Sequence, residues 1–448
     1  MSLKPARHIA LFLIAGFLAT GLTFSTPLEA QTPAPSEKAR ADPMPVTAQA
    51  MEQRTQDAIE VMQERKPAES VFSAGFLAQI PASQLHSLFK QLETQFGPFV
   101  ALESVQPANN NSARFMLRFE KAMAGGNIAL SPHGENLIDG LLINDYQTLN
   151  DTPEATLSQL KALPGDVSAL YAPLDRWAEP TLSLNPDSEL AIGSTSKLYV
   201  LAALAQSIAN GERHWDDIVR LDHFSLPSGQ MQDWPAGTPV TLATLATMMI
   251  SISDNTATDQ LIAVLGRDTI ASSVRQSGHA APDRMLPFLS TLELFALKGD
   301  PAMGHAFASA NEAEQASQLE ALDTRIGGDP SNITPPVFTE PHAIDTIEWY
   351  ASTQDLRAIL AQLQASDDPV IRNILAINPS VTPPVKERWA YVGFKGGSEP
   401  GVINLSWLLQ DKSGTWRVLI ISWNNTKAPL DKDVLELLAL RILALPVS

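Results

Sequence analysis

The stretch LAIGSTSKLYVLAAL, residues 190–204, places Ser194 and Lys197 three positions apart at the start of an apolar run. A serine followed by a lysine at this spacing is a short pattern that chance produces in a chain of 448 residues. It recurs at Ser87/Lys90 in HSLFKQ and at Ser158/Lys161 in LSQLKA. Both recurrences lie in predicted helices whose serine and lysine face solvent. The sequence around each pair must therefore decide which one carries chemistry.

Residues 195–208 predict a helix that is hydrophobic almost all round, so we expect it inside its domain. Ser194 then lies at the helix start, where unpaired backbone N–H groups and the positive end of the helix dipole gather. The alternative is that Ser194 is an ordinary N-cap and Lys197 reaches solvent. A buried helix disfavours this alternative because an unpaired buried ammonium is costly.

A second motif, Ser253-Asp254-Asn255, interrupts the apolar stretch VTLATLATMMISISDNTATDQLIAVLG. This stretch predicts one helix, a break at the triplet and a second helix. Asp254 or Asn255 would also serve as the N-cap of a helix that starts at Thr256. The two roles are compatible with each other.

Near the C-terminus the pattern predicts strands at 389–396, 402–410 and 415–423, followed by a closing helix. Two segments there combine a lysine with glycine. Lys395-Gly396-Gly397 lies on the first strand, and Lys412-Ser413-Gly414 lies in the turn between the other two.

In this order the three motifs resemble the signature of the serine β-lactamases and penicillin-binding proteins, with a spacing similar to that of the class A β-lactamases. The resemblance covers residues 152–448. It implies an α/β (α+β) fold, in which helices and a helical subdomain flank an antiparallel sheet. In that fold two strands and a terminal helix follow the lysine strand, which favours Lys395 over Lys412. PFLSTLELFALK and KGGSEPGV, with the small domain before them, resemble the serine hydrolases of clavulanic acid biosynthesis, which carry a steroid-isomerase-like N-terminal domain.

The chemistry of the residue types fits this resemblance. A serine hydroxyl is a poor nucleophile until a base takes its proton. Burial of Lys197 beside Lys395 should lower the pKa of Lys197 enough for its neutral amine to act as that base. We expect Ser253 to relay a proton to the leaving nitrogen. The expected catalytic residues are Ser194, Lys197, Ser253 and Lys395, the expected oxyanion donors are the N–H groups of Ser194 and Ser398, and the expected substrate-binding residues are Asn255, Gly396, Gly397 and Ser398.

The sequence departs from the family pattern at two places. Gly396 stands where the family has a hydroxyl that helps bind the substrate carboxylate, and Ser398 is a possible substitute on the same side of the strand. No Glu-x-x-x-Asn run occurs between the second and third motifs, where class A enzymes carry their deacylating glutamate. Glu340 and Glu348 are the candidate deacylation bases, and a surface carboxylate is the alternative interpretation of each. Without such a base an acyl-enzyme would hydrolyse slowly.

Composition and turn-forming residues divide the chain into four predicted segments. Residues 1–30 predict a cleaved Sec-type signal peptide, residues 31–46 a disordered linker, residues 47–148 a small α+β domain of helices and a curled sheet, and residues 152–448 the larger domain. We therefore expect an exported protein, periplasmic or secreted, with no membrane span after cleavage. The formal net charge of −18 argues against nucleic acid as a partner, and the absence of cysteine excludes disulfides and cysteine-ligated zinc. No metal or cofactor is expected, and the oligomeric state stays open.

The sequence thus predicts a serine hydrolase that forms an acyl-enzyme at Ser194 with a small-molecule substrate. Candidate substrates are a β-lactam, a peptidoglycan stem peptide and an ester. One alternative is an esterase or DD-peptidase-like enzyme with weak β-lactamase activity. A second is a penicillin-binding sensor or scaffold that does not turn over.

Overall fold

The computed structural model describes residues 46–131, 136–149, 151–336 and 339–446. The predicted signal peptide (1–30) and all of the predicted linker (31–46) except its last residue lie outside these ranges. The chain divides into two compact units, Met1–Asn150 and Asp151–Ser448. Within the described residues, no helix combines the length and the apolar character needed to cross a membrane.

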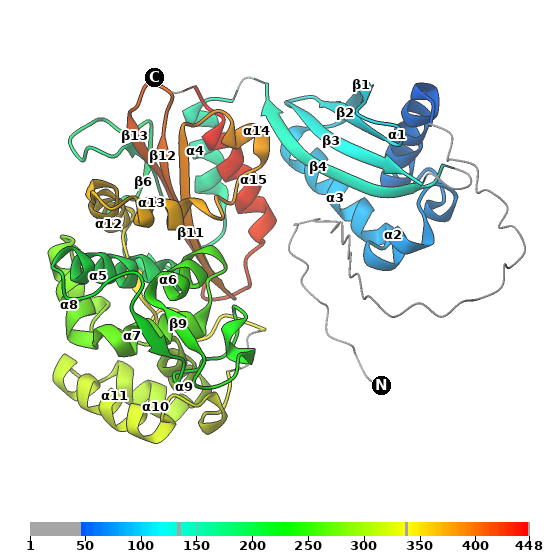
Figure 1. Cartoon of the computed structure of the whole chain (residues 1–448). Coiled ribbons are helices and arrows are strands. Elements are labelled where there is room, and N and C mark those ends of the chain that lie inside the picture. Colours follow the sequence, from blue (N-terminus) through cyan, green and yellow to red (C-terminus); the bar gives the residue numbers. More distant parts are fainter. Residues whose placement is uncertain (1–45, 132–135, 150, 337–338, 447–448) are drawn as a thin grey trace, which may run out of the picture. The chain divides into compact units, whose positions relative to one another are not determined.

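The first unit packs helices against an antiparallel sheet with the strand order β1-β2-β3-β4 (Figure 1). Alternate side chains of β2 are buried, as expected for a strand with one face toward a core. The apolar stripe of α3 meets this face, where Phe89 and Phe96 contact Phe119. The elements are α1 (Ala48–Met62), η1 (Ala68–Ser70), α2 (Ala74–Gln79), α3 (Ala82–Phe96), β1 (Phe99–Pro107), β2 (Ser112–Phe119), β3 (Ala122–Leu130) and β4 (Ile138–Thr148).

The second unit is built on a five-stranded antiparallel sheet with the order β11-β12-β13-β5-β6, so β11 is an edge strand. Successive side chains of β13 enter different cores: Val418 and Ile420 face one layer, and Leu419 and Ile421 face the other. Such a strand is apolar on both faces because helices cover both. The strands are β5 (Asp166–Pro173), β6 (Leu182–Leu184), β7 (Leu190–Ala191), β8 (Ile218–Arg220), β9 (Pro239–Thr241), β10 (Tyr350–Ala351), β11 (Tyr391–Glu399), β12 (Val402–Gln410) and β13 (Trp416–Asn424).

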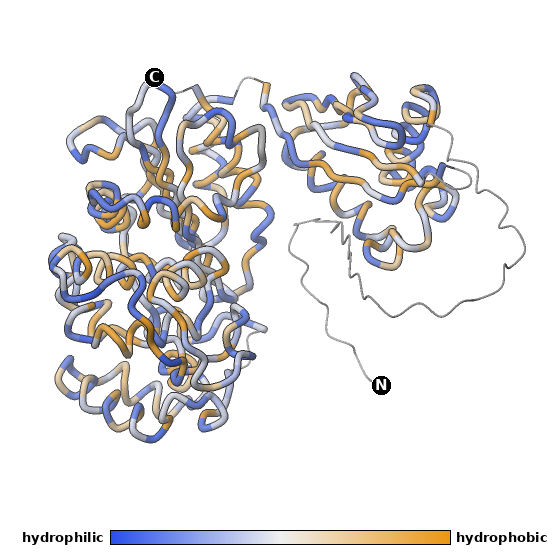
Figure 2. Tube along the Cα trace, viewed as in Figure 1, coloured by the Kyte–Doolittle hydropathy of each residue, from blue (hydrophilic) through white to orange (hydrophobic). Residues whose placement is uncertain are grey.

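Helices α4 (Pro153–Ala162) and α15 (Lys432–Leu443) pack on one face of this sheet. Helices α5 (Lys197–Ala209) and α12 (Thr353–Ala365) lie on the other face, and apolar residues concentrate along the strands and the helices that cover them (Figure 2). The remaining helices are α6 (Leu242–Ser251), α7 (Asn255–Leu265), α8 (Arg267–Gln276), α9 (Thr291–Gly299), α10 (Pro301–Ala308), α11 (Glu312–Ile326), α13 (Pro369–Ala376) and α14 (Pro383–Lys386), with single turns η2 (Gly193–Ser196), η3 (Met231–Asp233), η4 (Pro282–Arg284) and η5 (Pro330–Asn332).

The fold class agrees with the prediction of an antiparallel sheet flanked by helices, with a helical subdomain. One detail is wrong. The apolar pattern of residues 284–327 by itself predicts two helices, whereas the structure has three there, α9, α10 and α11. Asp300 ends α9 and caps α10, which begins at Pro301. Proline is well suited to a first helical position but not to a helix interior, so the chain restarts there.

Candidate active site

Ser194 lies in the single turn η2, directly before α5. Gly193 adopts a left-handed conformation with φ of 51°, which lets the chain enter this turn. The turn packs against the edge strand β11. A Cβ atom on Gly397 would lie 2.5 Å from the nitrogen of Ser194 and 2.1 Å from the oxygen of Ile192, so glycine is the residue that fits.

Asn404 of β12 stabilises the same turn by a hydrogen bond. The hydroxyl of Thr195 donates to the Oδ1 atom of Asn404 at 2.8 Å, and the Nδ2 atom of Asn404 donates to the hydroxyl of Ser422 at 2.7 Å. Asn404 is fully buried. Asn404 was not among the site residues predicted from the sequence, although an asparagine within the apolar strand VINLSWLLQ is a recognisable signal because buried amides need partners.

Lys197 is almost entirely buried at the first position of α5. Its Nζ atom lies 3.1 Å from the Oγ of Ser194 and 3.0 Å from the Oγ of Ser253. It donates to two carbonyl oxygens, the backbone oxygen of Ser253 and the Oδ1 of Asn255, both at 2.7 Å. A neutral amine has two N–H groups, and these two acceptors use both. In the neutral form the single lone pair is then left to accept from one of the two serine hydroxyls at a time.

Ser253 occupies the break between α6 and α7 in a left-handed conformation, with φ of 60°. Asp254 stabilises this break, because its buried carboxylate accepts from the backbone nitrogens of Gln230 (2.6 Å), Met231 (2.9 Å) and Ala257 (2.9 Å). Asp254 is therefore the N-cap of α7, as one of the two interpretations of the triplet predicts. The cap therefore helps to hold the carbonyl and the hydroxyl of Ser253, both of which contact Lys197.

Lys395 of β11 completes the cluster. Its Nζ atom lies 3.0 Å from the Oγ of Ser253 and donates to the backbone oxygen of Gly396 at 2.5 Å. Lys412 lies elsewhere, exposed in the turn between β12 and β13. The structure thus joins Ser194, Lys197, Ser253 and Lys395 by hydrogen bonds and leaves Lys412 apart. The other two Ser-x-x-Lys pairs lie on the helices α3 and α4.

Burial controls the charge of both lysines. It lowers the pKa of Lys197 to about 7, although the negative charges of Asp259 and Asp254 oppose the shift. Burial also lowers the pKa of Lys395 well below its ordinary value, and the neighbouring charge of Lys197 adds to this. Two ammonium groups that share one hydroxyl disfavour each other, so the pair readily supplies a neutral amine near pH 7.

The predicted binding residues have different surroundings. Asn255 accepts from Lys197 with its Oδ1, and its Nδ2 donates to the backbone oxygen of Leu226 at 3.0 Å, so at most one N–H is left for a substrate. Ser398 is exposed on the edge strand, and its backbone nitrogen lies 3.3 Å from the position of a Cβ on Gly193. Gly396 is half-buried and follows Lys395. The short distance between Gly193 and the nitrogen of Ser398 places the backbone of Ser398 beside the turn that carries Ser194.

Among the described residues, neither candidate deacylation base forms a hydrogen bond with Lys197 or Lys395. Glu340 is exposed. Glu348 is buried, and both of its carboxylate oxygens are engaged: one accepts from Lys298 at 3.0 Å and the other from the backbone nitrogen of Trp349 at 3.1 Å. The alternative interpretation of Glu348 as a surface carboxylate is wrong. The sequence hides its partner, which precedes it by 50 positions.

Among solved structures, 94% of the β-lactamase from Sphaerobacter thermophilus aligns with 65% of this chain, at 21% identity and a TM-score of 0.44. The β-lactamase from Chitinophaga pinensis aligns over 97% of its length and 66% of this chain, at 14% identity and a TM-score of 0.44. PBP-A aligns over 94% of its length and 65% of this chain, at 14% identity and a TM-score of 0.45.

Comparison with curated proteins gave no match. Comparison with family models matched residues 152–322 to the beta-lactamase enzyme family. This segment begins just before α4 and ends within α11, so it holds Ser194, Lys197 and the Ser253-Asp254-Asn255 triplet. The part of the second unit that carries these motifs is therefore similar to the beta-lactamase enzyme family.

Proposed function

We propose that this chain is an exported serine hydrolase that forms an acyl-enzyme at Ser194. The observation that carries the proposal is the connected set of Ser194, Lys197, Ser253 and Lys395, in which a nearly buried amine with a pKa lowered to about 7 lies 3.1 Å from the nucleophile. A serine beside such a base is the arrangement that nucleophilic catalysis requires. The family match is consistent with it.

The proposed reaction begins with a proton transfer from Ser194 to the neutral amine of Lys197. The Oγ atom of Ser194 attacks the carbonyl carbon of an amide, and the C–N bond then breaks to leave an ester on Ser194. The departing nitrogen takes its proton through the hydroxyl of Ser253, which contacts both lysines. The backbone N–H groups of Ser194 and Ser398 stabilise the negative oxygen that forms.

We propose substrates that carry a carboxylate next to the scissile amide, namely β-lactams or D-Ala-D-Ala stem peptides. Lys395 is the cation that would bind that carboxylate, aided by the exposed hydroxyl of Ser398 in place of the missing one at Gly396. Such substrates lie outside the cytoplasm, in agreement with the signal peptide predicted from residues 1–30.

The hydrogen bonds of Glu348 favour a second candidate function. This candidate is a penicillin-binding protein with little turnover. Its two oxygens bind Lys298 and the backbone of Trp349, so this carboxylate is not free to activate a water for ester hydrolysis. Glu340 is solvent-exposed. We therefore propose that the ester on Ser194 hydrolyses slowly when penicillin has formed it.

Intact-mass spectrometry of the protein with penicillin G tests the proposal. We expect an adduct of one penicillin on the unmodified chain and none on Ser194→Ala. Ser158→Ala is a matched control, since its Ser-x-x-Lys pair lies on α4 and should acylate normally. An adduct that persists on Ser194→Ala would overturn the proposal. The lifetime of the adduct separates turnover from capture, and a chromogenic cephalosporin measures any turnover directly.

A further inference from the structure

A buried cation outside the four-residue cluster is bound by two carboxylates. The side chain of Lys298, near the end of α9, has no exposed surface. Its Nζ atom contacts Glu348 at 3.0 Å and forms a closer ion pair with Glu399. The three residues come from different elements: α9, the segment before β10, and the last position of β11. We call these three residues the Lys298 triad.

Each carboxylate of the triad is linked to one of the two proposed oxyanion donors. Glu399 directly follows Ser398 on β11. Glu348 accepts from the nitrogen of Trp349 at 3.1 Å, and the oxygen of Trp349 accepts from the nitrogen of Ile192 at 3.0 Å. Ile192 stands two positions before Ser194. The triad therefore contacts, through short connections, both backbone segments that would form the oxyanion hole.

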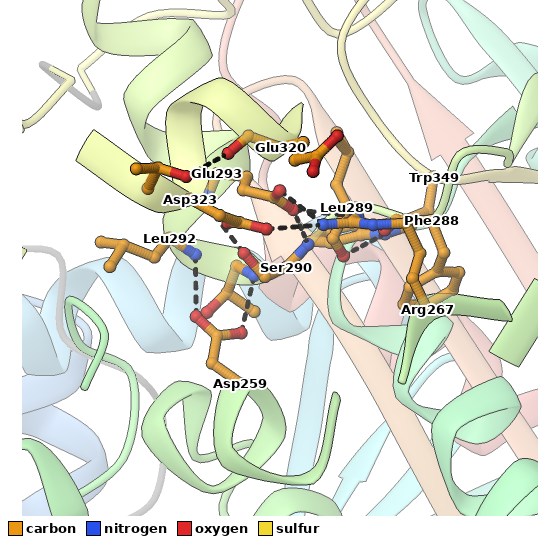
Figure 3. A network of polar contacts seen from close by, with 12 residues as sticks. Asp259, Arg267, Phe288, Leu289, Ser290, Leu292, Glu293, Glu320, Asp323 and Trp349 are labelled. Carbon is orange, nitrogen blue, oxygen red and sulfur yellow. Dashed lines mark hydrogen bonds and ion pairs between the residues drawn. The ribbon is translucent and has the colours of Figure 1, made fainter. Parts of the chain in front are cut away.

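The helix that carries Lys298 is itself firmly anchored. Asp259 of α7 accepts from the backbone nitrogens of Thr291 and Leu292 at the start of α9, at 2.7 and 2.9 Å (Figure 3). Arg267 binds the buried Glu293 at 2.6 Å in the same network. Lys298 therefore lies on a helix whose start is held by these contacts. A residue that positions other groups precisely needs such a rigid support.

The charges of the triad are mutually dependent. Burial would lower the pKa of Lys298, but the attraction of Glu348 and Glu399 outweighs it and the pKa is raised. Burial and the repulsion of Glu348 raise the pKa of Glu399 to about 8, against the attraction of Lys298. The charged form of Lys298 therefore depends on its two acidic partners. A broken triad would leave a buried charge unpaired, at high cost.

We propose that Lys298 is a positioning residue that holds the backbone N–H donors of Ser194 and Ser398 in register through Glu348 and Glu399. This inference rests on the proposed acylation of Ser194. Oxyanion donors act only when their spacing matches the developing charge, and a displacement of about 1 Å can reduce a rate on the order of a hundredfold. Loss of the triad should therefore slow acylation while it leaves the initial binding of a substrate carboxylate at Lys395 intact.

The test compares Lys298→Met with Arg441→Met in the full chain. Arg441 is the matched control, since it is a buried cation of the same unit, paired with Asp151 at 2.7 Å on α15, away from β11. We expect the acylation rate constant with a fluorescent penicillin to fall about 10- to 100-fold in Lys298→Met, with an unchanged dissociation constant of the initial complex. Arg441→Met should lose stability and acylate at the normal rate. Glu399→Ala, which keeps the Lys298–Glu348 pair, serves if Lys298→Met does not fold.

Two further measurements separate positioning from simple destabilisation. The carbonyl stretch of the acyl-enzyme should move to higher frequency in Lys298→Met because weaker hydrogen bonds polarise the ester less. Hydrogen exchange should rise at the amides of residues 192–198 and 396–399 in this variant, and not in Arg441→Met. Equal rates, stretches and exchange in both variants would overturn the inference. If the unmodified chain forms no adduct, the proposed function fails, and the exchange measurement still decides whether the triad orders these segments.

Discussion

The Nζ atom of Lys197 lies 3.1 Å from the Oγ atom of Ser194, with both groups at the start of one buried helix. Its two carbonyl partners, Ser253 and Asn255, come from the break between two other helices. Lys197, the proposed base, is therefore oriented by a segment other than the one that carries Ser194, the proposed nucleophile. In its neutral form, Lys197 has one lone pair left to accept from the hydroxyl of Ser194 or of Ser253.

The first prediction concerns pH. Acylation needs the neutral amine of Lys197, whose pKa burial lowers to about 7. The acylation rate constant should therefore rise with pH through about 7 and level off above it. Asp259 raises the pKa of Lys197 by its negative charge, so Asp259→Asn should move the inflection to lower pH. Stopped-flow measurements between about pH 5 and 9 check this. A shift to higher pH would contradict the assignment of Lys197 as the base.

The second prediction separates the two lysine motifs. Lys395→Ala removes the cation that shares the hydroxyl of Ser253 with Lys197, so acylation should fall by about a hundredfold or more, as for one preorganised electrostatic group. Lys412→Ala should leave acylation unchanged, because a lysine in an exposed turn contributes little. Parallel rate measurements with penicillin G give the answer. A defective Lys412 variant would exclude the role proposed for β11.

The strands around the third motif were predictable because local periodicity carried the necessary information, whereas the preference for Lys395 over Lys412 came from the family resemblance. Alternation and turn residues predict strands at 389–396, 402–410 and 415–423, and the observed strands β11, β12 and β13 agree within three residues at each end. The break at Ser253-Asp254-Asn255 was predictable for the same reason, since a polar triplet interrupts an apolar run. These features depend on neighbours in sequence.

The Lys298 triad was not predictable, because its members lie 50 and 101 positions apart in the chain. Nothing in the local pattern marks Glu348 as buried, and acidic residues are ordinarily exposed. The backbone conformation at the Ser253 break was not predictable for the same reason, since it depends on residues distant in sequence. The carboxylate of Asp254, which stabilises the break, accepts from the backbone nitrogens of Gln230 and Met231, more than twenty positions earlier in the chain. Long-range polar contacts are visible only in the folded chain.

The third prediction concerns the hydrogen bonds that Asp254 accepts beside Ser253. Asp254→Asn replaces one carboxylate oxygen by an NH₂ group, which accepts no hydrogen bond, so either the bond from Ala257 or the two bonds from Gln230 and Met231 are lost. Each buried donor left without a partner costs about 1–3 kcal/mol, so the variant should unfold at lower denaturant and acylate more slowly. Asp431→Asn, at the exposed N-cap of α15, is the control and should affect acylation little. Equal acylation by both variants would show that Asp254 does not position Ser253.

The final prediction tests how closely β11 must approach the nucleophile. A Cβ atom at residue 397 would lie 2.5 Å from the nitrogen of Ser194 and 2.7 Å from that of Thr195, distances that real Cβ atoms do not reach. Gly397→Ala must therefore push the strand and the turn apart, which separates the proposed oxyanion donors of Ser194 and Ser398. Acylation should fall on the order of a hundredfold. Gly140→Ala in the first unit is the control, because its Cβ would meet Ala129 at an ordinary 3.4 Å. Rates within twofold of each other for the two variants, with both proteins folded by circular dichroism, would mean that the close contact of β11 with the Ser194 turn is not required for catalysis.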